Sequence, residues 1–526
     1  MTLVVSSGRQ SLRRFTTWMP LILIAVLGLV LVLLYTRFGA GVGGDAVRYV
    51  VGAENLLLGN GYSYKSGGGE IVPITAFPPF FPMVLAGLGL TGVDLFELAR
   101  LLNALLFALT LFLCGYMLYR HTRSIWASII ACLMILTPYT LVQIFGWAMA
   151  EALYIFMMLL TILGMAVYLD RENPWILVGT AILSGLASLT RYVGLGLVGA
   201  GALSILVLSK AEWRRRLVHV ILFSVLGITP IVIWFGRNAR VAGTLANRSL
   251  IFHPMRGDLL RQYAEEIASW LVPVQFDLPR IRYRLLLSIG IFILGALLVL
   301  IPRIRSKNWK NASPSGSYLD LPWILLINIF SYLMVLVLNS MFLDAGTTPG
   351  AVSRYLAPVF IMIVMLFASW VSRLLEGTKL VSLSRIGIAT LSVALILLYA
   401  QRTAKLILDP ELTLGYVTAK MFWTEEIQAL QAIEPTQTII TNNTELAYIL
   451  SGRTAYMIPV SFNPNNLEER EDFPEQISIA RERLSEDGVL IIFGYGELDD
   501  NARKVVEQLD VVPVQILNMV KLYTLP

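Results

Sequence analysis

The sequence contains few of the residues from which proteins build metal centres and disulfide frameworks. Among its 526 residues there are two cysteines and three histidines, and only 14% of the residues are charged. Cys114 and Cys132 both fall inside apolar segments, so neither a disulfide framework nor a thiolate metal site is supported. His253 has no second histidine or cysteine near it in the sequence, so we do not expect it to bind a metal ion. Internal repeats and long low-complexity tracts are also absent from the sequence.

The abundance of apolar residues indicates a membrane protein. The chain is 56% hydrophobic and its mean hydropathy is +0.70, values typical of polytopic membrane proteins. The net charge of +6 does not indicate a nucleic-acid partner, because much of the basic excess lies in short clusters between apolar segments. Such clusters follow the positive-inside rule. We therefore predict a polytopic α-helical protein of the cell (inner) membrane that contacts membrane lipids.

The N-terminus carries a basic cluster before the first apolar run. Arg9, Arg13 and Arg14 precede the apolar residues 21–34, an arrangement that resembles a long signal peptide. No clear small-x-small cleavage site follows before Tyr35. We expect an uncleaved first transmembrane helix with its N-terminus in the cytoplasm; a cleaved signal is the alternative.

Residues 1–400 are expected to form the transmembrane domain. A span needs about 20 apolar residues, and about eleven segments qualify, some of them short. The spans are expected at 18–35, 97–119, 125–142, 147–169, two short halves of 174–208 that meet at Arg191, 217–235, 285–301, 321–338, 356–371 and 386–399. Residues 36–96 and 236–283 are the expected outer loops, and the short apolar stretch 80–90 is expected to be a helix at the membrane interface.

An odd number of spans places residues 401–526 outside the cytoplasm. This part alternates segments with helical and strand patterns, which indicates a small extracytoplasmic α/β domain. It contains no nucleophile elbow, phosphate loop or metal-ligand cluster in its sequence. We expect this part of the chain to have a supporting or recognition role, and not to catalyse a reaction.

The polar residues that this topology collects on the outer side form the candidate site. Asp45 lies in the first outer loop, and Glu151 lies near the outer end of the span at 147–169. The other candidates are Arg48, Tyr49, Arg191, Arg237, Arg354 and Tyr355. Ionisable residues at membrane depth are costly, so they usually pair or bind something. Two acids and several arginines on one face predict a site for an anionic, phosphate-bearing substrate.

These residue types supply a coherent chemistry. Arginine holds phosphate oxygens bidentately and stays charged. A carboxylate within hydrogen-bond reach can take the proton from an acceptor hydroxyl as it attacks an anomeric carbon. Phosphate leaves well when cations neutralise its developing charge. The residues therefore suit transfer of a sugar from a phosphate-linked donor.

Each candidate also has a plain structural interpretation. Asp45 could be a solvated loop acid or a charge favoured at a helix N-terminus, and Glu151 could pair with an arginine across the bundle. Arg191 and Arg354 could extend to the outer headgroups. Arg48 and Arg237 could be ordinary interfacial or loop residues. The Gly67 to Gly69 run could be a mobile loop, since the strand and helix that confirm a phosphate cradle are missing from the sequence pattern.

Several motifs together resemble the GT-C superfamily of membrane glycosyltransferases. They are D-A-V-R-Y-V-V-G-A-E-N-L-L-L-G-N-G-Y from Asp45, T-A-F-P-P-F-F-P from Thr75, the acid Glu151, L-T-R-Y-V-G from Leu189 and S-R-Y-L-A-P from Ser353. Over about residues 15–400 the resemblance is to the protein O-mannosyltransferase and lipid A aminoarabinose transferase branch. It implies a polyprenyl-phosphate-linked sugar donor and a glycan, lipid or protein acceptor on the extracytoplasmic side.

The resemblance also implies roles for single residues. Asp45 matches the first-loop catalytic acid, which acts as general base in an inverting transfer, and Glu151 matches the second-loop acid. Arg191 falls where a basic residue near the donor phosphate is expected, and Arg354 with Tyr355 matches the late Arg-Tyr pair.

The sequence departs from the pattern of this superfamily at two places. Many relatives carry two adjacent acids in the first loop, whereas Asp45 is followed by Ala46. We therefore expect that no cofactor is required; a divalent metal at Asp45 and Glu151 is the alternative, which the sequence does not support. Ser353 stands where an acid is common, so Arg354 lacks a local partner. The alternatives to an enzyme are a transporter or flippase of a lipid-linked glycan and a catalytically silent membrane scaffold.

Overall fold

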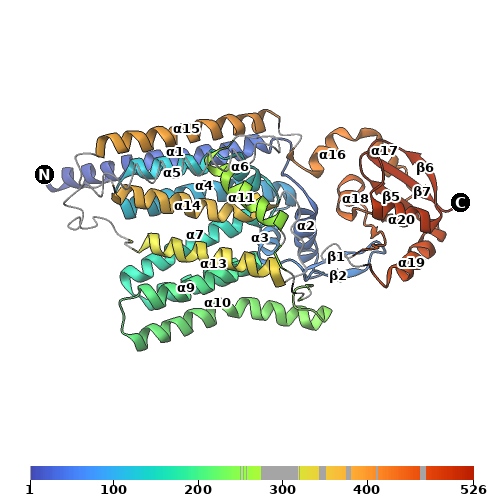
Figure 1. The fold of residues 1–526 in the computed structure, drawn as a ribbon, viewed down its shortest axis with the longest axis horizontal. Helices are drawn as coiled ribbons and strands as arrows, with labels where there is room; N and C mark the ends of the chain where they lie inside the picture. Colours follow the sequence, from blue (N-terminus) through green and yellow to red (C-terminus); the bar gives the residue numbers. More distant parts are fainter. Residues whose placement is uncertain are drawn as a thin grey trace.

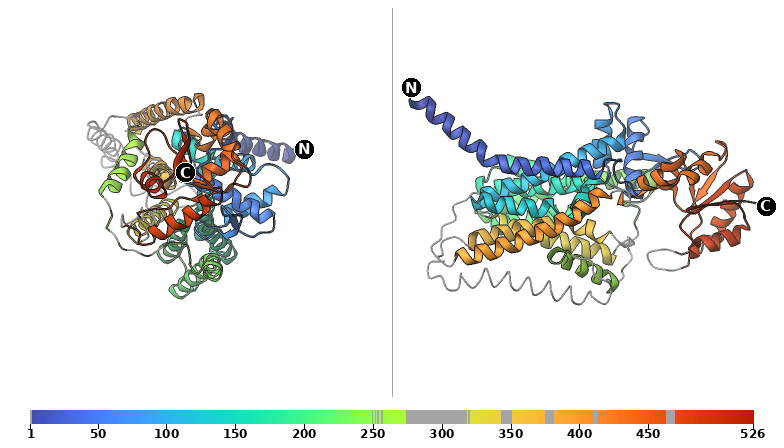
Figure 2. Two further views of the ribbon diagram at one scale, coloured as in Figure 1. Left: turned by 90° about the vertical axis from the view of Figure 1, so that its right-hand side faces the viewer. Right: turned by 90° about the horizontal axis from the view of Figure 1, so that it is seen from above.

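The computed structural model describes residues 2–248, 250, 252, 254–255, 257–273, 318, 320–342, 351–374, 381–409, 413–462 and 469–526. A bundle of helices forms one end of the molecule, and a sheet flanked by helices forms the other (Figure 1). The view from above shows the sheet again beyond one end of the bundle, and the view along the long axis shows it in front of the bundle (Figure 2). The expected span at 285–301 and His253 lie outside the described residues.

Seven of the described helices are long and apolar enough to cross a membrane. They are α1 (Thr2–Tyr35), α4 (Leu95–Thr122), α7 (Glu151–Arg171), α10 (Trp213–Ala242), α13 (Leu321–Phe342), α14 (Val352–Leu374) and α15 (Val381–Leu408). Large apolar side chains such as Leu23, Ile233 and Phe330 are exposed on these helices, as expected where lipid replaces water. The chain is therefore an integral membrane protein.

The expected count of eleven spans stays a prediction. Some of the expected spans are bent or short helices in the structure, and one lies outside the described residues. Residues 125–142 were expected to form one span, but α5 (Ile125–Leu136) and α6 (Tyr139–Gly146) are bent by 66°. The bend falls at Pro138, which has no backbone N–H to continue a helix. Counting this pair as one span gives up to eight among the described residues. In the segment 174–208, α8 (Pro174–Thr190), the 3₁₀ turn η1 (Tyr192–Gly194) and α9 (Leu195–Leu208) are shorter apolar helices that separate at Arg191.

Residues 36–96, the expected first outer loop, fold into compact structure at the end of the bundle that adjoins the sheet (Figure 1). It contains α2 (Gly44–Leu57), the two short antiparallel strands β1 (Ser63–Lys65) and β2 (Ile71–Pro73), and α3 (Phe80–Gly89). The apolar stretch expected at the membrane interface is α3. It packs against α2, where Tyr49 meets the edge of the Phe81 ring at 5.6 Å between ring centroids.

The second expected outer loop, at 236–283, also contains structure. Helix α11 (Gly257–Leu271) packs beside α14, and the Trp270 ring lies 5.3 Å from the Phe360 ring between centroids. Its end is tied to α15, since the Arg402 guanidinium donates to the Pro273 carbonyl at 3.0 Å. Residues 257–273 of this segment are therefore folded onto the bundle.

The C-terminal sheet has five strands in the order β4-β3-β5-β7-β6. The strands are β3 (Ile439–Thr441), β4 (Tyr456–Met457), β5 (Val489–Phe493), β6 (Val512–Ile516) and β7 (Val520–Thr524); the helices are α16 (Tyr416–Phe422), α17 (Thr424–Gln431), α18 (Thr444–Ser451), α19 (Phe473–Ser485) and α20 (Asp500–Leu509). Strands β3, β4 and β5 are parallel, whereas β7 is antiparallel to β5 and β6.

The strands β3, β5 and β7 are buried, whereas the edge strand β6 is exposed. Ile439 and Ile491 belong to one apolar cluster, which includes side chains from α17 and α18. Ile440 and Leu490 belong to a second cluster, with α19 and α20. Neighbouring strand residues point to opposite faces, so the helices on the two sides give three layers. Helix α15 continues to Leu408, and the division into domains at residue 401 stays a proposal.

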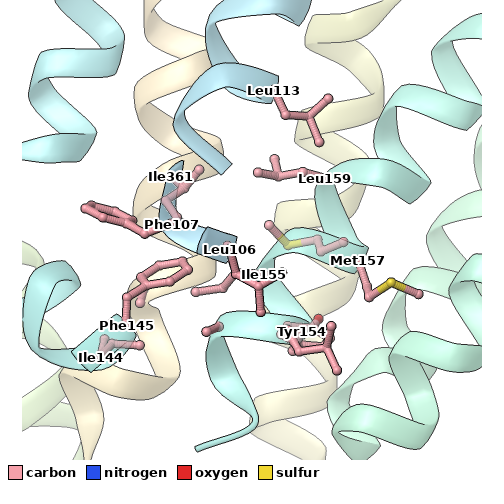
Figure 3. Packing of buried hydrophobic residues seen from close by; sticks show 14 of the residues in the cluster. Leu106, Phe107, Leu113, Ile144, Phe145, Tyr154, Ile155, Met157, Leu159 and Ile361 are labelled. Atoms are coloured by element: carbon pink, nitrogen blue, oxygen red, sulfur yellow. The ribbon is translucent and has the colours of Figure 1, made fainter. Parts of the chain in front are cut away.

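One cluster of buried apolar residues joins several helices of the bundle. Phe107 of α4 and Phe145 of α6 pack with 4.6 Å between ring centroids. Ile155 of α7 and Ile361 of α14 lie in the same cluster (Figure 3). Helices α4, α6, α7 and α14 therefore share one packed core, which fixes the positions of the residues at their ends.

We predict that Gly415→Ala destabilises the protein more than a matched glycine substitution. Gly415 has a φ of +65° and an added Cβ would collide with the Val42 carbonyl, whereas Gly243 has a φ of +66° and nothing within 4 Å of its Cβ position. At Gly243, where ψ is +9°, the left-handed helical backbone costs alanine about 1–2 kcal/mol. At Gly415, where ψ is −125°, the backbone lies in a region of positive φ that only glycine adopts readily, and the collision adds to that cost. Thermal unfolding of the purified variants in detergent measures the difference, and equal shifts would contradict it.

Candidate active site

The position of Asp45 is set by the backbone that leads into α2. On one side the Gly41 N–H donates to the Gly146 carbonyl at 3.0 Å, and Gly41 accepts from the Ala148 N–H at 2.9 Å. On the other side the Val42 N–H donates to the Leu414 carbonyl at 3.1 Å. Gly41 must be a glycine here, since an added Cβ would collide with the Trp147 indole. The start of α2 is thus held between the α6–α7 connection and the chain before α16.

Glu151 is the first residue of α7 and is buried, with 4% of its surface exposed. A carboxylate at a helix N-terminus is stabilised by the free backbone N–H groups of the first turn. The α5–α6 bend returns the chain so that α7 begins beside the start of α2. Glu151 therefore lies at the end of α7 that faces the first outer loop.

Arg191 lies where α8 ends, with extended backbone at φ −148° and its N–H bonded to the Ala187 carbonyl. The free carbonyls at a helix C-terminus favour a cation there. Its guanidinium forms an ion pair with Glu151. The break between α8 and α9 therefore delivers a positive charge to the buried carboxylate.

Arg354, in the first turn of α14, joins the two acids. Its guanidinium contacts Asp45 Oδ2 at 3.2 Å and Glu151 Oε1 at 3.1 Å. Because Ser353 stands before it, Arg354 has no acidic neighbour in the sequence. Its two acidic partners come from distant parts of the chain. Asp45, Glu151, Arg191 and Arg354, which we call the ion cluster, thus come from four separate elements. Their formal charges sum to zero, which reduces the cost of burying them.

The ion cluster borders a cavity of about 410 Å³. Asp45, Glu151 and Arg354 line it, together with residues of α6, the α6–α7 connection and the start of α14. The Asp45 side chain is 40% exposed, so the cavity is open to a ligand on that side. Glu151 Oε1 receives both arginines, whereas its buried Oε2 has no hydrogen-bond partner among the described residues. Buried polar atoms are normally bonded, so Oε2 is an available acceptor.

Two tyrosines lie beside the ion cluster. The Tyr355 ring is 5.6 Å from the Arg191 guanidinium carbon and 5.5 Å from that of Arg354. Tyr49 is buried on α2, packed against the Phe77 ring at 5.3 Å. Burial, and then the negative charges of the two acids, raise the pKa of the Tyr49 phenol, which stays protonated. The Tyr355 ring therefore packs near both arginines, and the Tyr49 ring packs on the buried side of α2.

The remaining two candidates contact other parts of the protein. Arg48 Nε donates to Glu445 at 2.7 Å, and its guanidinium lies 4.1 Å from the Tyr64 ring centroid. Arg237 donates to the carbonyls of Ile74 at 2.8 Å and Tyr62 at 3.0 Å. Neither residue lines the 410 Å³ cavity. The structure does not bring them into the ion cluster, and their expected substrate contacts stay a prediction.

The sequence analysis missed several cavity residues. Thr140, Gln143, Trp147 and Met149 line the cavity, and Met149 Sδ accepts from Arg354 at 3.3 Å. Trp147 is recognisable as an aromatic residue near a span end. The other three carry no signal in a single sequence, because their role depends on the bend between α5 and α6.

Metal ligands do not gather in the described part of the chain. No group of three or more histidine, cysteine, aspartate or glutamate side chains lies close enough there to hold an ion. Asp45 and Glu151 instead share the Arg354 guanidinium. A cation between them would face this positive charge, so the arrangement fits a metal poorly.

One segment of the chain matches a known protein family. Residues 76–239 match the profile of the dolichyl-phosphate-mannose-protein mannosyltransferase family. This match confirms the resemblance to the GT-C superfamily of membrane glycosyltransferases, and it supports a glycosyltransferase as the class. The matched segment includes Glu151 and Arg191, whereas Asp45 and Arg354 lie outside it.

The solved structures to which the chain is similar include two of ArnT from Cupriavidus metallidurans. The one bound to undecaprenyl phosphate has 13% identity and a TM-score of 0.47, over 96% of this chain and 98% of ArnT. The apo structure has 14% identity and a TM-score of 0.46, over 96% of this chain and 97% of ArnT.

A third solved structure is the archaeal oligosaccharyltransferase AglB from Archaeoglobus fulgidus, in complex with an inhibitory peptide and a dolichol-phosphate. It has 11% identity and a TM-score of 0.46, over 91% of this chain and 70% of AglB. No curated protein matches the sequence.

Proposed function

We propose that the protein transfers a sugar from a polyprenyl-phosphate-linked donor to an acceptor on the extracytoplasmic side of the membrane. The observation that carries the proposal is the ion cluster of two carboxylates and two guanidiniums beside an open cavity at one end of the bundle. The family match over residues 76–239 supports the same class of donor. The acceptor is a glycan, lipid or protein that presents a nucleophilic group to Asp45.

In the proposed reaction, Asp45 acts as the general base. It takes the proton of an acceptor hydroxyl while the hydroxyl oxygen attacks the anomeric carbon from the face opposite the phosphate, so the configuration inverts. The bond between the anomeric carbon and the phosphate oxygen breaks, and polyprenyl phosphate leaves with that electron pair. The partial exposure of Asp45 to the cavity suits contact with an entering acceptor.

The shared arginine couples the two charges that change in this step. Before transfer, Arg354 is balanced by Asp45 and Glu151. When Asp45 accepts the proton it loses its negative charge, so the ion cluster gains one net positive charge as the phosphate gains one negative charge. Each guanidinium has five N–H donors, which leaves donors for phosphate oxygens. Arg191 and Arg354 are therefore the proposed phosphate ligands, oriented by Glu151.

The test is sugar transfer by the purified protein in proteoliposomes. Undecaprenyl-phosphate hexose and pentose donors are supplied with candidate acceptors, and release of free undecaprenyl phosphate is measured with and without EDTA. We expect release that needs both acceptor and protein and that EDTA leaves unchanged, because Arg354 occupies the space between the carboxylates. Movement of intact donor across the bilayer without release would favour a transporter and contradict the proposal. Loss of release in EDTA alone would show that a metal takes part.

A further inference from the structure

The C-terminal part of the chain contacts the first outer loop on the side of α2 that carries Arg48. Arg48 Nε and Glu445 Oε1 are 2.7 Å apart, and both side chains are largely buried, at 27% and 18% exposed. Glu445 belongs to α18, which is 397 residues away in the sequence. Arg48 follows Asp45 by three residues, so it lies one helical turn further along α2.

A second bond joins the same two helices. The Tyr448 hydroxyl donates to Glu54 Oε2 at 3.1 Å. Burial and the neighbouring Glu54 carboxylate raise the pKa of Tyr448 to about 12, so the hydroxyl keeps its proton at neutral pH. Two bonds at different points along a helix restrict both its rotation and its position along its axis. With a single bond, the helix could still turn about that bond.

The glycine-rich tip between β1 and β2 gives a third contact. An added Cβ at Gly67 or Gly68 would collide with the Tyr456 ring, so the tip packs closely against the C-terminal sheet. The close approach explains why Gly67 and Gly68 lack side chains, whereas Gly69, with a φ of +82°, has nothing within 4 Å of its Cβ position. The strands β1 and β2 thereby link α2 to the edge strand β4.

The seam between these parts is polar and incompletely filled. A cavity of about 270 Å³ lies in it, lined by residues of α2, β1 and α18 that include Arg48, Glu54, Glu445 and Tyr448. Tyr448 and Ile449 of α18 also pack against the apolar cluster of the bundle, and backbone bonds hold the residues just before α2. Loss of the two polar bonds is therefore expected to loosen the rest of α2 beyond its first residues, while the chain stays folded.

We propose that α18 holds helix α2 in the position that aims Asp45 into the active-site cavity, and that Glu445 and Tyr448 are positioning residues. This inference rests on the proposed function for Asp45. A general base must lie within hydrogen-bond reach of its proton, and a misplacement of about 1 Å can lower a rate by about 10²-fold. The C-terminal part then sets the reaction rate without contacting the reacting atoms.

The test combines kinetics with amide hydrogen exchange on the full-length protein in proteoliposomes or detergent. The double variant Glu445→Gln with Tyr448→Phe is expected to lower kcat about tenfold, leave KM for the undecaprenyl-phosphate donor unchanged, and speed exchange in residues 45–57. The matched control is Asp472→Asn, which removes an exposed ion pair with Arg470 on the same part of the chain. It should change none of the three values.

Rescue separates positioning from a general loss of stability. The charge swap Arg48→Glu with Glu445→Arg is expected to recover at least threefold in kcat over either single variant. Wild-type kcat in the double variant, or a swap no better than its single variants, overturns the proposal. If the wild-type protein transfers no sugar, the proposed function fails, and the exchange measurement alone then decides whether α18 holds α2. Unchanged exchange in residues 45–57 overturns the contact as well.

Discussion

Replacing Asp45 by asparagine is expected to lower the rate of sugar transfer by about 10²–10⁴-fold, the usual contribution of a positioned general base. Asparagine keeps the size of the side chain but cannot accept the acceptor proton. It also removes the negative charge that Arg354 contacts at 3.2 Å. The net charge of the ion cluster then stays the same during the reaction and does not become more positive as the phosphate gains its negative charge. Single-turnover transfer from an undecaprenyl-phosphate sugar measures the loss.

Folding must be separated from chemistry in this comparison. The Asp45 side chain is 40% exposed, so the substitution should leave thermal unfolding in detergent nearly unchanged. Asp472→Asn applies the same chemical change to an exposed aspartate far from the cavity and should keep wild-type transfer. Wild-type turnover of a folded Asp45→Asn protein would remove Asp45 from the role of base.

Replacing Glu151 by glutamine is expected to be the most destabilising change in the site. Glu151 Oε1 contacts both Arg191 and Arg354, and the residue is 4% exposed. Removing one partner of a buried ion pair leaves an uncompensated charge and costs about 3–5 kcal/mol in soluble proteins. The unfolding temperature in detergent should therefore fall clearly, and transfer should be lost because the arginines are no longer oriented.

The exposed pair Arg261 and Glu265 on α11 provides the matched control. Glu265→Gln breaks an ion pair of 2.7 Å in which the arginine is 54% exposed, and such pairs contribute about 1 kcal/mol or less. A double variant, Glu151→Gln with Arg191→Met, should be less destabilised than the sum of its single variants, because the unpaired charge is removed with its partner. Equal shifts of the unfolding temperature for Glu151→Gln and Glu265→Gln would contradict the prediction that Glu151 compensates buried charges.

Hydropathy and topology identified Asp45, Glu151, Arg191 and Arg354 as candidates because each ionisable residue falls at or near the end of an apolar segment. They did not separate Arg48 and Arg237 from this group. All six residues lie on the same expected side of the membrane, and their types are alike. The direction of each side chain depends on helix rotation and on distant partners, such as Glu445 for Arg48.

The sequence by itself determined that the chain is built from apolar membrane helices and which segments alternate as helix and strand after about residue 422; it did not predict α16 (Tyr416–Phe422). Both follow from local periodicity and composition, because secondary structure depends largely on interactions between residues that are close in the sequence. Only the tertiary structure decided that Arg354 joins Asp45 to Glu151, that the α5–α6 bend opens a cavity beside them, and that α18 holds α2. These contacts link residues hundreds of positions apart, so they depend on the packing of the whole bundle and carry no local signal.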